Sequence, residues 1–330
     1  MASVGIVTIG RNEGDRLVRC LSALRDRLPP ETPIVYVDSG STDNSIAEAQ
    51  SRNVKVISLD LSIPFTAARS RNTGWQHLVE QYPDLDFIQF LDGDCELYAD
   101  WLDHALAKFT EDEAIAVVCG RRRERFPDAT PYNRLADMEW NTPVGEAEAC
   151  GGDSLIRVKA LQAVNGYNPR LICGEEPEMC IRMRAKGWRV FRIGIDMTLH
   201  DAAMTRWGQY WKRSVRGGWA VAEGYAMYGK TEGYMKRQHT SGWLWGLIVP
   251  LIIFGAAWPT KGLSLILLLG YLYLGWRIYQ YRHRGYSDRP DHARLYAYYT
   301  VLSKLPQMVG QAQYWLGRWQ GKQATLIEYK

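Results

Sequence analysis

The feature that most constrains the fold is a regular alternation, starting at residue 3, of short β-rich runs with amphipathic helical runs. Residues 4–9 form the first β-rich run. The apolar residues that follow recur with helical spacing, at Leu17, Cys20, Leu21, Leu24 and Leu28. Such alternation is typical of a sheet covered by crossover helices. The sequence therefore predicts an α/β domain at this end of the chain.

The same pattern continues toward the middle of the chain. Further buried strands are predicted at residues 34–37, 54–59, 87–91 and 115–119. Helical spacing is present at residues 154–164, 176–186 and 204–228. The intervening stretch, residues 121–150, is charged and poorly periodic, which favours a long connection or a lid.

Polar segments follow three of the predicted strands. RNEG follows the first, DSGSTDNS the second and DGDCE the fourth. Because ligands of open α/β sheets bind outside the carboxyl ends of the strands, we expect these segments to converge on one crevice. In the second segment, Asp38 offers acceptor oxygens suited to a base imide, whereas Asp43 is better explained as a helix cap.

The segment Asp92-Gly93-Asp94 is the best candidate for a metal site. Two carboxylates that are two residues apart can both face one cation only if the residue between them turns sharply, and glycine permits that turn. Mg²⁺ or Mn²⁺ fits carboxylate and phosphate oxygens. Taken alone, the segment is also compatible with an ordinary Asp-Gly turn.

Charge and cysteine usage argue against two classes of function. The net charge of +4 is mild, whereas nucleic-acid-binding proteins carry strongly basic, clustered faces. The six cysteines lack CxxC spacing, so we expect reduced thiols and no zinc site. The N-terminus has no long apolar stretch, so we expect no signal peptide and a first domain in the cytoplasm.

The composition changes in the C-terminal third. Residues 243–258 and 263–276 carry no charge and flank a short loop that contains Lys261, which predicts a helical hairpin over about 243–281. A helix over the first run would be about 24 Å long, against about 30 Å for a bilayer core, so spanning would need flanking residues. The alternative is a buried hairpin of a soluble domain.

Basic and aromatic residues around this hairpin favour a membrane. The basic residues lie on its two outer flanks, so both flanks are expected to face the cytoplasm. Residues 291–320 mix aliphatic residues with Tyr and Trp, as interfacial amphipathic helices do. We therefore expect a catalytic domain over residues 1–230 and a membrane region over residues 231–330, at the cytoplasmic face of the cell (inner) membrane.

Six segments then follow one another in a fixed order: IVTIGRNE, VDSGSTDNS, SRNTG, FLDGDCE, CGGDSLIRVKAL with NGYNPRL, and GEEPEMCIRMRAKGW. Together they resemble the motifs of the inverting family 2 glycosyltransferases, over about residues 3 to 228. The resemblance implies a GT-A fold, that is, a Rossmann-like domain that transfers sugars from nucleoside diphosphates. C-terminal membrane-associated helices would follow this domain.

The resemblance also implies roles for individual residues. Asp38 would contact the base, Glu13 and Asp92 the nucleoside or ribose, and Arg71 the nucleotide. The residues assigned to the nucleotide sugar are Thr8, Asn12, Glu13, Asp38, Arg71, Asp92 and Gly93. The metal would be held by Asp94 and Asp92, with His200 as a further ligand.

The catalytic base departs from the family pattern. Glu176 stands where the family has a catalytic Asp, and glutamate is one methylene longer. The adjacent Glu175 therefore remains an alternative base, as does Glu178, although an acid in the first turn of a helix also stabilises the helix dipole.

The expected activity is metal-dependent, inverting transfer of a sugar from a nucleotide donor in polysaccharide or glycolipid biosynthesis. A UDP-sugar is favoured as donor and a GDP-sugar is possible. The acceptor would be lipid-linked or a glycan near the membrane. The alternatives are a processive polysaccharide synthase, which one short hairpin does not favour, and an inactive nucleotide-binding scaffold, which would not need the acidic residues.

Overall fold

The structure is a computed structural model that describes residues 2–321, and the chain divides into two compact units. Unit 1 comprises residues 1–127 and 139–202, and unit 2 comprises residues 128–138 and 203–330. The end of the expected membrane region, residues 322–330, lies outside the described residues.

Unit 1 is built on a nine-stranded mixed sheet with the order β3-β2-β1-β4-β8-β6-β9-β5, in which β7 pairs with β9. The strands are β1 Val4–Gly10, β2 Ile34–Asp38, β3 Lys55–Ser58, β4 Phe87–Asp92, β5 Cys95–Leu97, β6 Ile115–Glu124, β7 Gly145–Glu146, β8 Ser154–Arg157 and β9 Arg189–His200. All five predicted strands are confirmed. The first four strands are parallel, whereas β8 runs antiparallel between β4 and β6.

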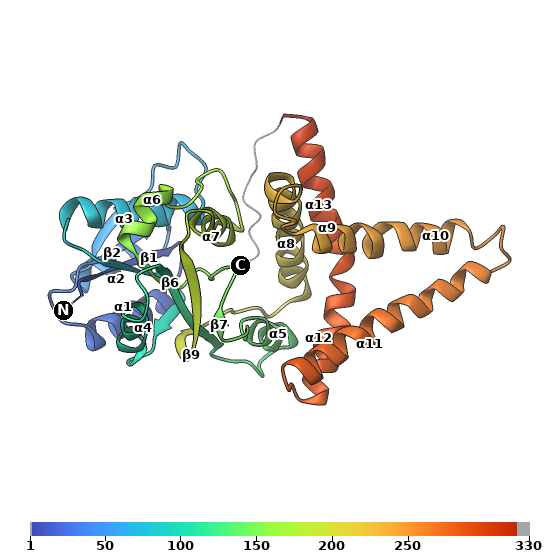
Figure 1. Ribbon diagram of the computed structural model, residues 1–330, viewed down its shortest axis with the longest axis horizontal. Coiled ribbons are helices and arrows are strands. Elements are labelled where there is room, and N and C mark those ends of the chain that lie inside the picture. The colour runs from blue at the N-terminus through green and yellow to red at the C-terminus, as the bar shows by residue number, and fades with distance from the viewer. Residues whose placement is uncertain (1, 322–330) are drawn as a thin grey trace. The chain divides into compact units, whose positions relative to one another are not determined.

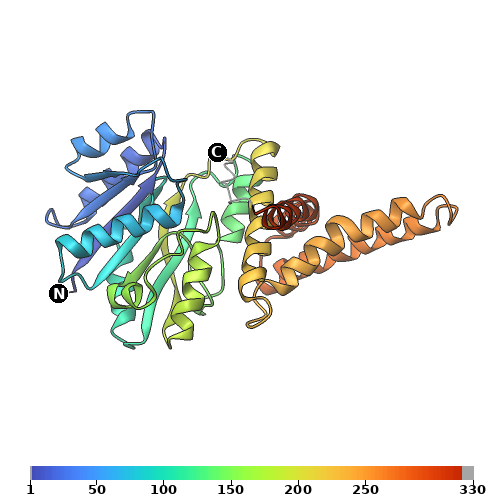
Figure 2. The same cartoon turned by 90° about the horizontal axis from the view of Figure 1, so that it is seen from above.

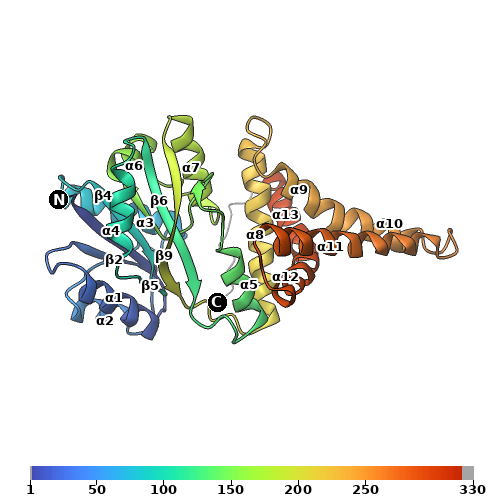
Figure 3. The ribbon, with the colours of Figure 1, turned by 60° about the horizontal axis from the view of Figure 1, so that its bottom comes forward.

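Helices cover both faces of this sheet. They are α1 Asp15–Arg27, α2 Ser45–Ser51, α3 Ala67–Gln81, α4 Trp101–Phe109, α6 Val158–Val164 and α7 Glu175–Ala185. Figure 1 shows α3, α6 and α7 on one face and α1 and α4 on the other. The helical stripe Leu17, Cys20, Leu21 and Leu24 is buried, as amphipathic spacing predicts. Figure 3 shows the long strands β6 and β9 side by side, where they pair in parallel.

Two sequence predictions in unit 1 are corrected. Residues 154–164 were predicted to be wholly helical, but Ser154–Arg157 forms strand β8 and the helix begins at Val158. The reason is that Leu155 and Ile156 pair with both β4 and β6, and this pairing overrides local periodicity. The stretch 121–150 is not simply a connection, because β6 extends into it and it contains helix α5 (Pro131–Glu139) and strand β7.

Unit 2 is helical. Besides α5, it contains α8 Trp207–Tyr228, α9 Lys236–Trp243, the π-helical turn η1 Leu244–Ile248, α10 Val249–Gly255, the 3₁₀ turn η2 Leu263–Leu267, α11 Leu268–Gly285, α12 Pro290–Leu302 and α13 Lys304–Trp319. Figure 2 shows α10 and α11, in orange, as the two limbs of one hairpin. The hydroxyl of Ser264 donates to the carbonyl of Ile253 (2.7 Å) and ties the limbs together.

The hairpin predicted at residues 243–281 is therefore present, but not as a pair of spanning helices. Within residues 2–321, no helix combines the length and the apolar character that crossing a membrane requires. The first limb is divided between η1 and α10 and ends at Gly255, and the second limb ends in a polar turn with Arg282, His283 and Arg284.

Close packing of α3 on the sheet gives a test of this fold. A Cβ atom on Gly74 would lie 2.4 Å from Cγ1 of Val7, whereas one on Gly217, in the exposed part of α8, would meet nothing within 4 Å. We expect Gly74→Ala to lower the free energy of unfolding by about 1–3 kcal/mol, because the helix must move off the sheet. Gly217→Ala is the matched control, and urea unfolding should show it to be neutral or slightly stabilising. Equal effects of the two substitutions would contradict the packing described.

Candidate active site

The register of the sheet brings the polar segments together. Gly10, at the end of β1, pairs with Asp38 at the end of β2, and Ile9 pairs with Asp92 at the end of β4. Since these strands are parallel neighbours, the segments that follow them leave the same edge of the sheet. The convergence expected from the sequence is therefore present.

The first two of these segments hold each other in place. Oδ1 of Asn12 accepts from the backbone N–H of Thr42 (2.7 Å), and the N–H of Asn12 donates to Oγ of Ser41 (2.9 Å). Asp38 is 1% exposed, and its Oδ2 accepts from the N–H groups of Gly40 and Ser41, both at 2.9 Å. The carboxylate of Asp38 therefore holds the loop that follows β2 through hydrogen bonds to its backbone.

Three further residues of the expected nucleotide site lie beside the end of β1. Thr8 is fully buried within β1. The N–H of Gly93 donates to the carbonyl of Ile9 (2.8 Å), and a Cβ atom on Gly93 would lie 3.1 Å from that carbonyl oxygen. Cγ of Glu13 would lie 3.4 Å from the same Cβ, so Glu13 is next to the turn of the DGD segment. Its carboxylate forms an ion pair with Arg16 (2.8 Å).

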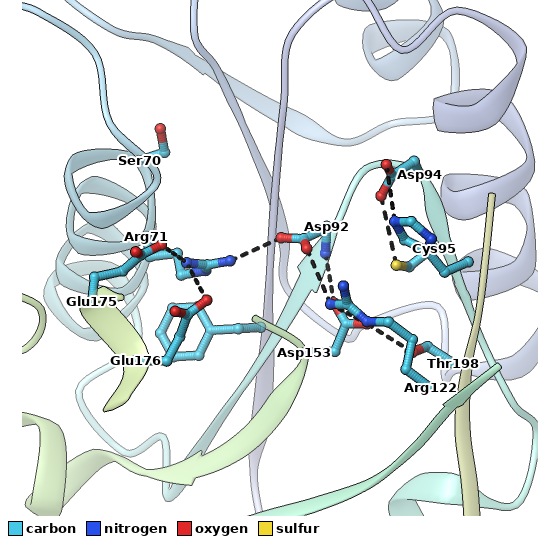
Figure 4. Close-up of polar contacts among 12 residues, drawn as sticks. Ser70, Arg71, Asp92, Asp94, Cys95, Arg122, Asp153, Glu175, Glu176 and Thr198 are labelled. Atoms are coloured by element: carbon cyan, nitrogen blue, oxygen red, sulfur yellow. Dashed lines mark hydrogen bonds and ion pairs between the residues drawn. The ribbon is translucent and has the colours of Figure 1, made fainter. Parts of the chain in front are cut away.

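Arg71, from helix α3, lies at the centre of the site (Figure 4). Its Nη2 contacts Oδ1 of Asp92 (2.9 Å), and its Nη1 contacts Oε1 of Glu175 (2.8 Å) and Oε1 of Glu176 (3.1 Å). Burial alone would lower the pKa of Arg71, but the carboxylates around it raise that pKa well above its ordinary value. A permanently charged guanidinium therefore links the DGD segment to the first turn of α7.

The two candidate bases differ in environment. The side chain of Glu175 is 5% exposed and that of Glu176 is 14% exposed. Burial, followed by the charge of Glu175, raises the pKa of Glu176 to about 7, against the opposing effect of Arg71. Glu178 instead pairs with Arg182 one turn along α7 (2.7 Å).

A second arginine, which is partly buried and which the sequence analysis missed, lies on the other side of Asp92. Nη2 of Arg122, from β6, contacts Oδ2 of Asp92 (3.1 Å) and Oδ2 of Asp153 (2.8 Å). Asp153 is itself buried, accepts the backbone N–H of Asp92 (3.0 Å) and accepts the hydroxyl of Thr198 (2.7 Å). These contacts fix both the side chain and the backbone of Asp92.

Weak sequence signals for these residues existed. Asp153 falls within the CGGDS segment that resembles a family motif, but spacing does not show which way its side chain faces. Arg122 belongs to the charged run RRRE, at the start of the stretch predicted to be a long connection or a lid. In the structure this run is the end of strand β6.

Gly152 leaves room between the DGD segment and the candidate base. A Cβ atom at this position would lie 2.5 Å from Nη2 of Arg71, 3.0 Å from Oδ2 of Asp92 and 3.2 Å from Oε1 of Glu176. Any side chain here would therefore displace the ion pairs of Arg71. Glycine is the residue that allows both carboxylates to reach the same guanidinium.

Asp94 faces a different group of residues, at the ends of β5, β6 and β9. Its Oδ2 lies 3.3 Å from Nε2 of His200, and His200 pairs with Cys95 and Glu124 in the strand register. The pKa of His200 is lowered, mainly by burial, so its ring is neutral near pH 7. Burial also raises the pKa of Cys95 well above its usual range, so its thiol stays protonated.

These residues could hold a divalent cation such as Mn²⁺ or Mg²⁺. Asp94, Cys95 and His200 offer ligand atoms within 4.8 Å of one another. The carboxylate and the neutral imidazole, completed by phosphate oxygens, would give a donor set that Mn²⁺ or Mg²⁺ can use. Both oxygens of Asp92 already contact arginines, so Asp94 and His200 form the candidate metal pair.

Comparison with known proteins agrees with this geometry. Residues 3–162 match the model of the family described as Glycosyl transferase family 2. Glycosyltransferase AglE of Haloferax volcanii is 23% identical over 195 residues, which is 56% of this chain and 62% of that protein. The curated relatives that the chain matches are covered over 33% to 62% of their own length.

Solved structures show the same fold at low identity. A mannosyltransferase from Pyrobaculum calidifontis, in complex with GDP-Man and Mn²⁺, has a TM-score of 0.66 at 12% identity, covering 94% of this chain and 86% of that one. Glucosyl-3-phosphoglycerate synthase from Mycobacterium tuberculosis, with Mn²⁺ and UDP, has a TM-score of 0.50 at 15% identity, covering 69% and 80%. Residues 3–162 thus resemble a family 2 glycosyltransferase domain, and the solved structures show that unit 1 has a GT-A-like fold.

Proposed function

We propose that the protein is a metal-dependent, inverting glycosyltransferase that uses a UDP- or GDP-sugar. The observation that carries this proposal is the chain of contacts from Asp92 through Arg71 to Glu176, with the Asp94–His200 pair beside it. A donor diphosphate needs a cation, and an acceptor hydroxyl needs a base. Both requirements are met by side chains at one edge of the sheet.

In the proposed reaction, Glu176 accepts the proton of the acceptor hydroxyl as that oxygen attacks the anomeric carbon of the donor sugar. The bond from that carbon to the diphosphate breaks on the opposite face, so a single displacement inverts the configuration. A divalent cation held by Asp94 and His200 would stabilise the negative charge of the departing diphosphate. Arg71 and Arg122 hold Asp92 in position for the nucleoside.

Glu176 suits the role of base better than Glu175. Glu175 is the more buried of the two and lies closer to Arg71, which holds its carboxylate in an ion pair. A general base works best when its pKa is near the working pH, and the pKa of Glu176 is about 7. The greater length of glutamate is accommodated because Gly152 leaves space for the carboxylate.

We further propose a lipid-linked or glycan acceptor close to a membrane, at the cytoplasmic face of the cell (inner) membrane. The support for this part is the apolar surface of the hairpin in unit 2, where Trp258 is 93% exposed and Phe254 is 72% exposed. Exposed apolar patches of this kind mark interaction sites.

A donor screen tests the reaction class directly. With Mn²⁺ and a panel of nucleotide sugars, the purified chain should release a nucleoside diphosphate from one donor, slowly even without acceptor, because water replaces the hydroxyl. Product release is measured by coupled detection of the nucleoside diphosphate. Failure to bind or turn over any donor would overturn the proposed function.

Substitution of the glutamates identifies the base. We expect Glu176→Gln to reduce transfer by about a hundredfold or more, since the amide cannot accept the proton, while donor binding measured by calorimetry remains. Glu148→Gln, at an exposed position of the same unit, is the control. If Glu175→Gln has the larger effect on transfer, the base is Glu175 instead.

The proposed base also sets the pH dependence of transfer. Glu176 accepts a proton only when it is deprotonated, so activity should rise with pH through about 7 and level off above that value. Below the pKa, the rate should fall by about tenfold per pH unit. A kcat/KM profile that is flat between pH 5 and 8 would contradict the role of Glu176.

Metal binding is tested separately from catalysis. We expect Asp94→Asn and His200→Gln each to weaken Mn²⁺ binding in the presence of nucleoside diphosphate by about tenfold or more, because each removes one ligand. Electron paramagnetic resonance of free Mn²⁺ measures this loss. Asp100→Asn, at an exposed position near the same segment, should bind as the unsubstituted protein does.

A further inference from the structure

The hairpin of unit 2 ends in a surface made almost entirely of large apolar side chains. We call this surface the apolar tip, and its members are the exposed residues Leu251, Phe254, Trp258, Leu263, Ile266 and Leu269. The least exposed of them, Leu269, is 58% exposed. Isolated apolar residues are common on protein surfaces, but a contiguous group of this kind calls for a partner.

The apolar surface also includes a run of consecutive residues in the second limb. Leu265, Ile266, Leu267, Leu268 and Leu269 are consecutive, and every one of them is exposed. Because consecutive helical residues point in different directions around the axis, the apolar surface of this limb is wider than a single stripe and is interrupted where Ser264 packs on the first limb. A protein partner would cover one face, whereas lipid acyl chains surround an inserted segment completely.

The length of the free part of the hairpin matches one leaflet of a bilayer. Its root is anchored within unit 2: the hydroxyl of Tyr271 donates to the carbonyl of Trp245 (2.5 Å), and a Cβ atom on Gly246 would lie 2.4 Å from the carbonyl oxygen of Lys304 in α13. Beyond this root, the helical part of the limb from residue 248 to residue 255 extends about 12 Å at 1.5 Å per residue, and the loop with Trp258 follows it. Helix and loop together are shorter than the hydrocarbon core, which is about 30 Å thick, and they fit within about one leaflet.

The root carries the groups that favour a lipid headgroup region. The rings of Tyr273 and Trp276 stack with centroids 5.9 Å apart, and the guanidinium of Arg277 lies over Tyr273. Lys236 and Arg237 are exposed at the start of α9, on the other limb. Tyr and Trp prefer the membrane interface, and cationic side chains are attracted to anionic lipids.

We propose that this hairpin inserts into one leaflet of an anionic membrane, with the apolar tip among the acyl chains and the rings of the root at the headgroups. One part of this inference rests on the proposed function: insertion would keep the enzyme next to a membrane-proximal acceptor. Lys261 is the charged residue of the tip loop. Its charge opposes insertion, and the apolar side chains around it outweigh that cost.

Vesicle binding by the full-length protein tests the insertion. The vesicles contain phosphatidylethanolamine and phosphatidylglycerol, and bound protein is separated by flotation. We expect Phe254→Glu combined with Ile266→Glu to reduce the bound fraction by about tenfold or more, and Lys261→Leu to increase it. Val144→Glu, at an apolar position of unit 1 that is 63% exposed, is the matched control and should not change binding.

Two results would overturn this inference. One is unchanged vesicle binding by the double variant. The other is a tip that is covered by a second copy of the chain. In that case the unsubstituted protein self-associates in sedimentation and does not bind vesicles, and the double variant no longer self-associates. Donor hydrolysis is measured on the same samples, so that loss of membrane binding with intact hydrolysis is distinguished from failure of the proposed function or of folding.

The depth of the tip is measured with a dye attached to Trp258→Cys, since the native cysteines are all buried. Spin-labelled lipids should quench the dye most strongly when the label is near the bilayer centre. Strongest quenching by headgroup labels would contradict insertion into one leaflet.

Discussion

The arrangement of unit 1 depends on two arginines that keep several carboxylates together. Parallel strands deliver Asp92 to the same sheet edge as the segments after β1 and β2, and α7 brings Glu175 and Glu176 toward it. Carboxylates gathered away from water repel one another unless cations lie among them. Arg71 supplies that charge on one side of Asp92, and Arg122 supplies it on the other. The ion pairs also explain why glycine stands at position 152, because a larger residue would separate them.

Much of this architecture follows from the sequence for physical reasons. Buried apolar runs identify strands such as β2, and an aspartate at the end of such a run can be placed at the edge of the sheet without further information. Local patterns fail where long-range pairing decides the structure. Ser154–Arg157 has helical spacing, yet it completes the sheet between β4 and β6. Similarly, nothing in a run of charged residues shows that Arg122 will turn toward Asp153.

Unit 2 illustrates a different limit of sequence patterns. An uncharged run shows that a segment avoids water, but not how the segment is divided into elements. Here the first limb of the hairpin is interrupted by a π-helical turn and the second begins as a 3₁₀ turn. The length available for burial in lipid is set by where the root packs on α13, which only the folded structure defines.

Asp92 and Glu176 both contact the guanidinium of Arg71, so the charge of one carboxylate affects the other. The negative charge of Asp92 is one of the influences that raise the pKa of Glu176. A ligand that neutralised the charge of Asp92 would therefore lower the pKa of Glu176. By thermodynamic reciprocity, the protonation state of Glu176 changes the affinity for that ligand by the same factor. In the proposed reaction, occupancy of the donor site and the protonation state of Glu176 would thus be coupled through charge.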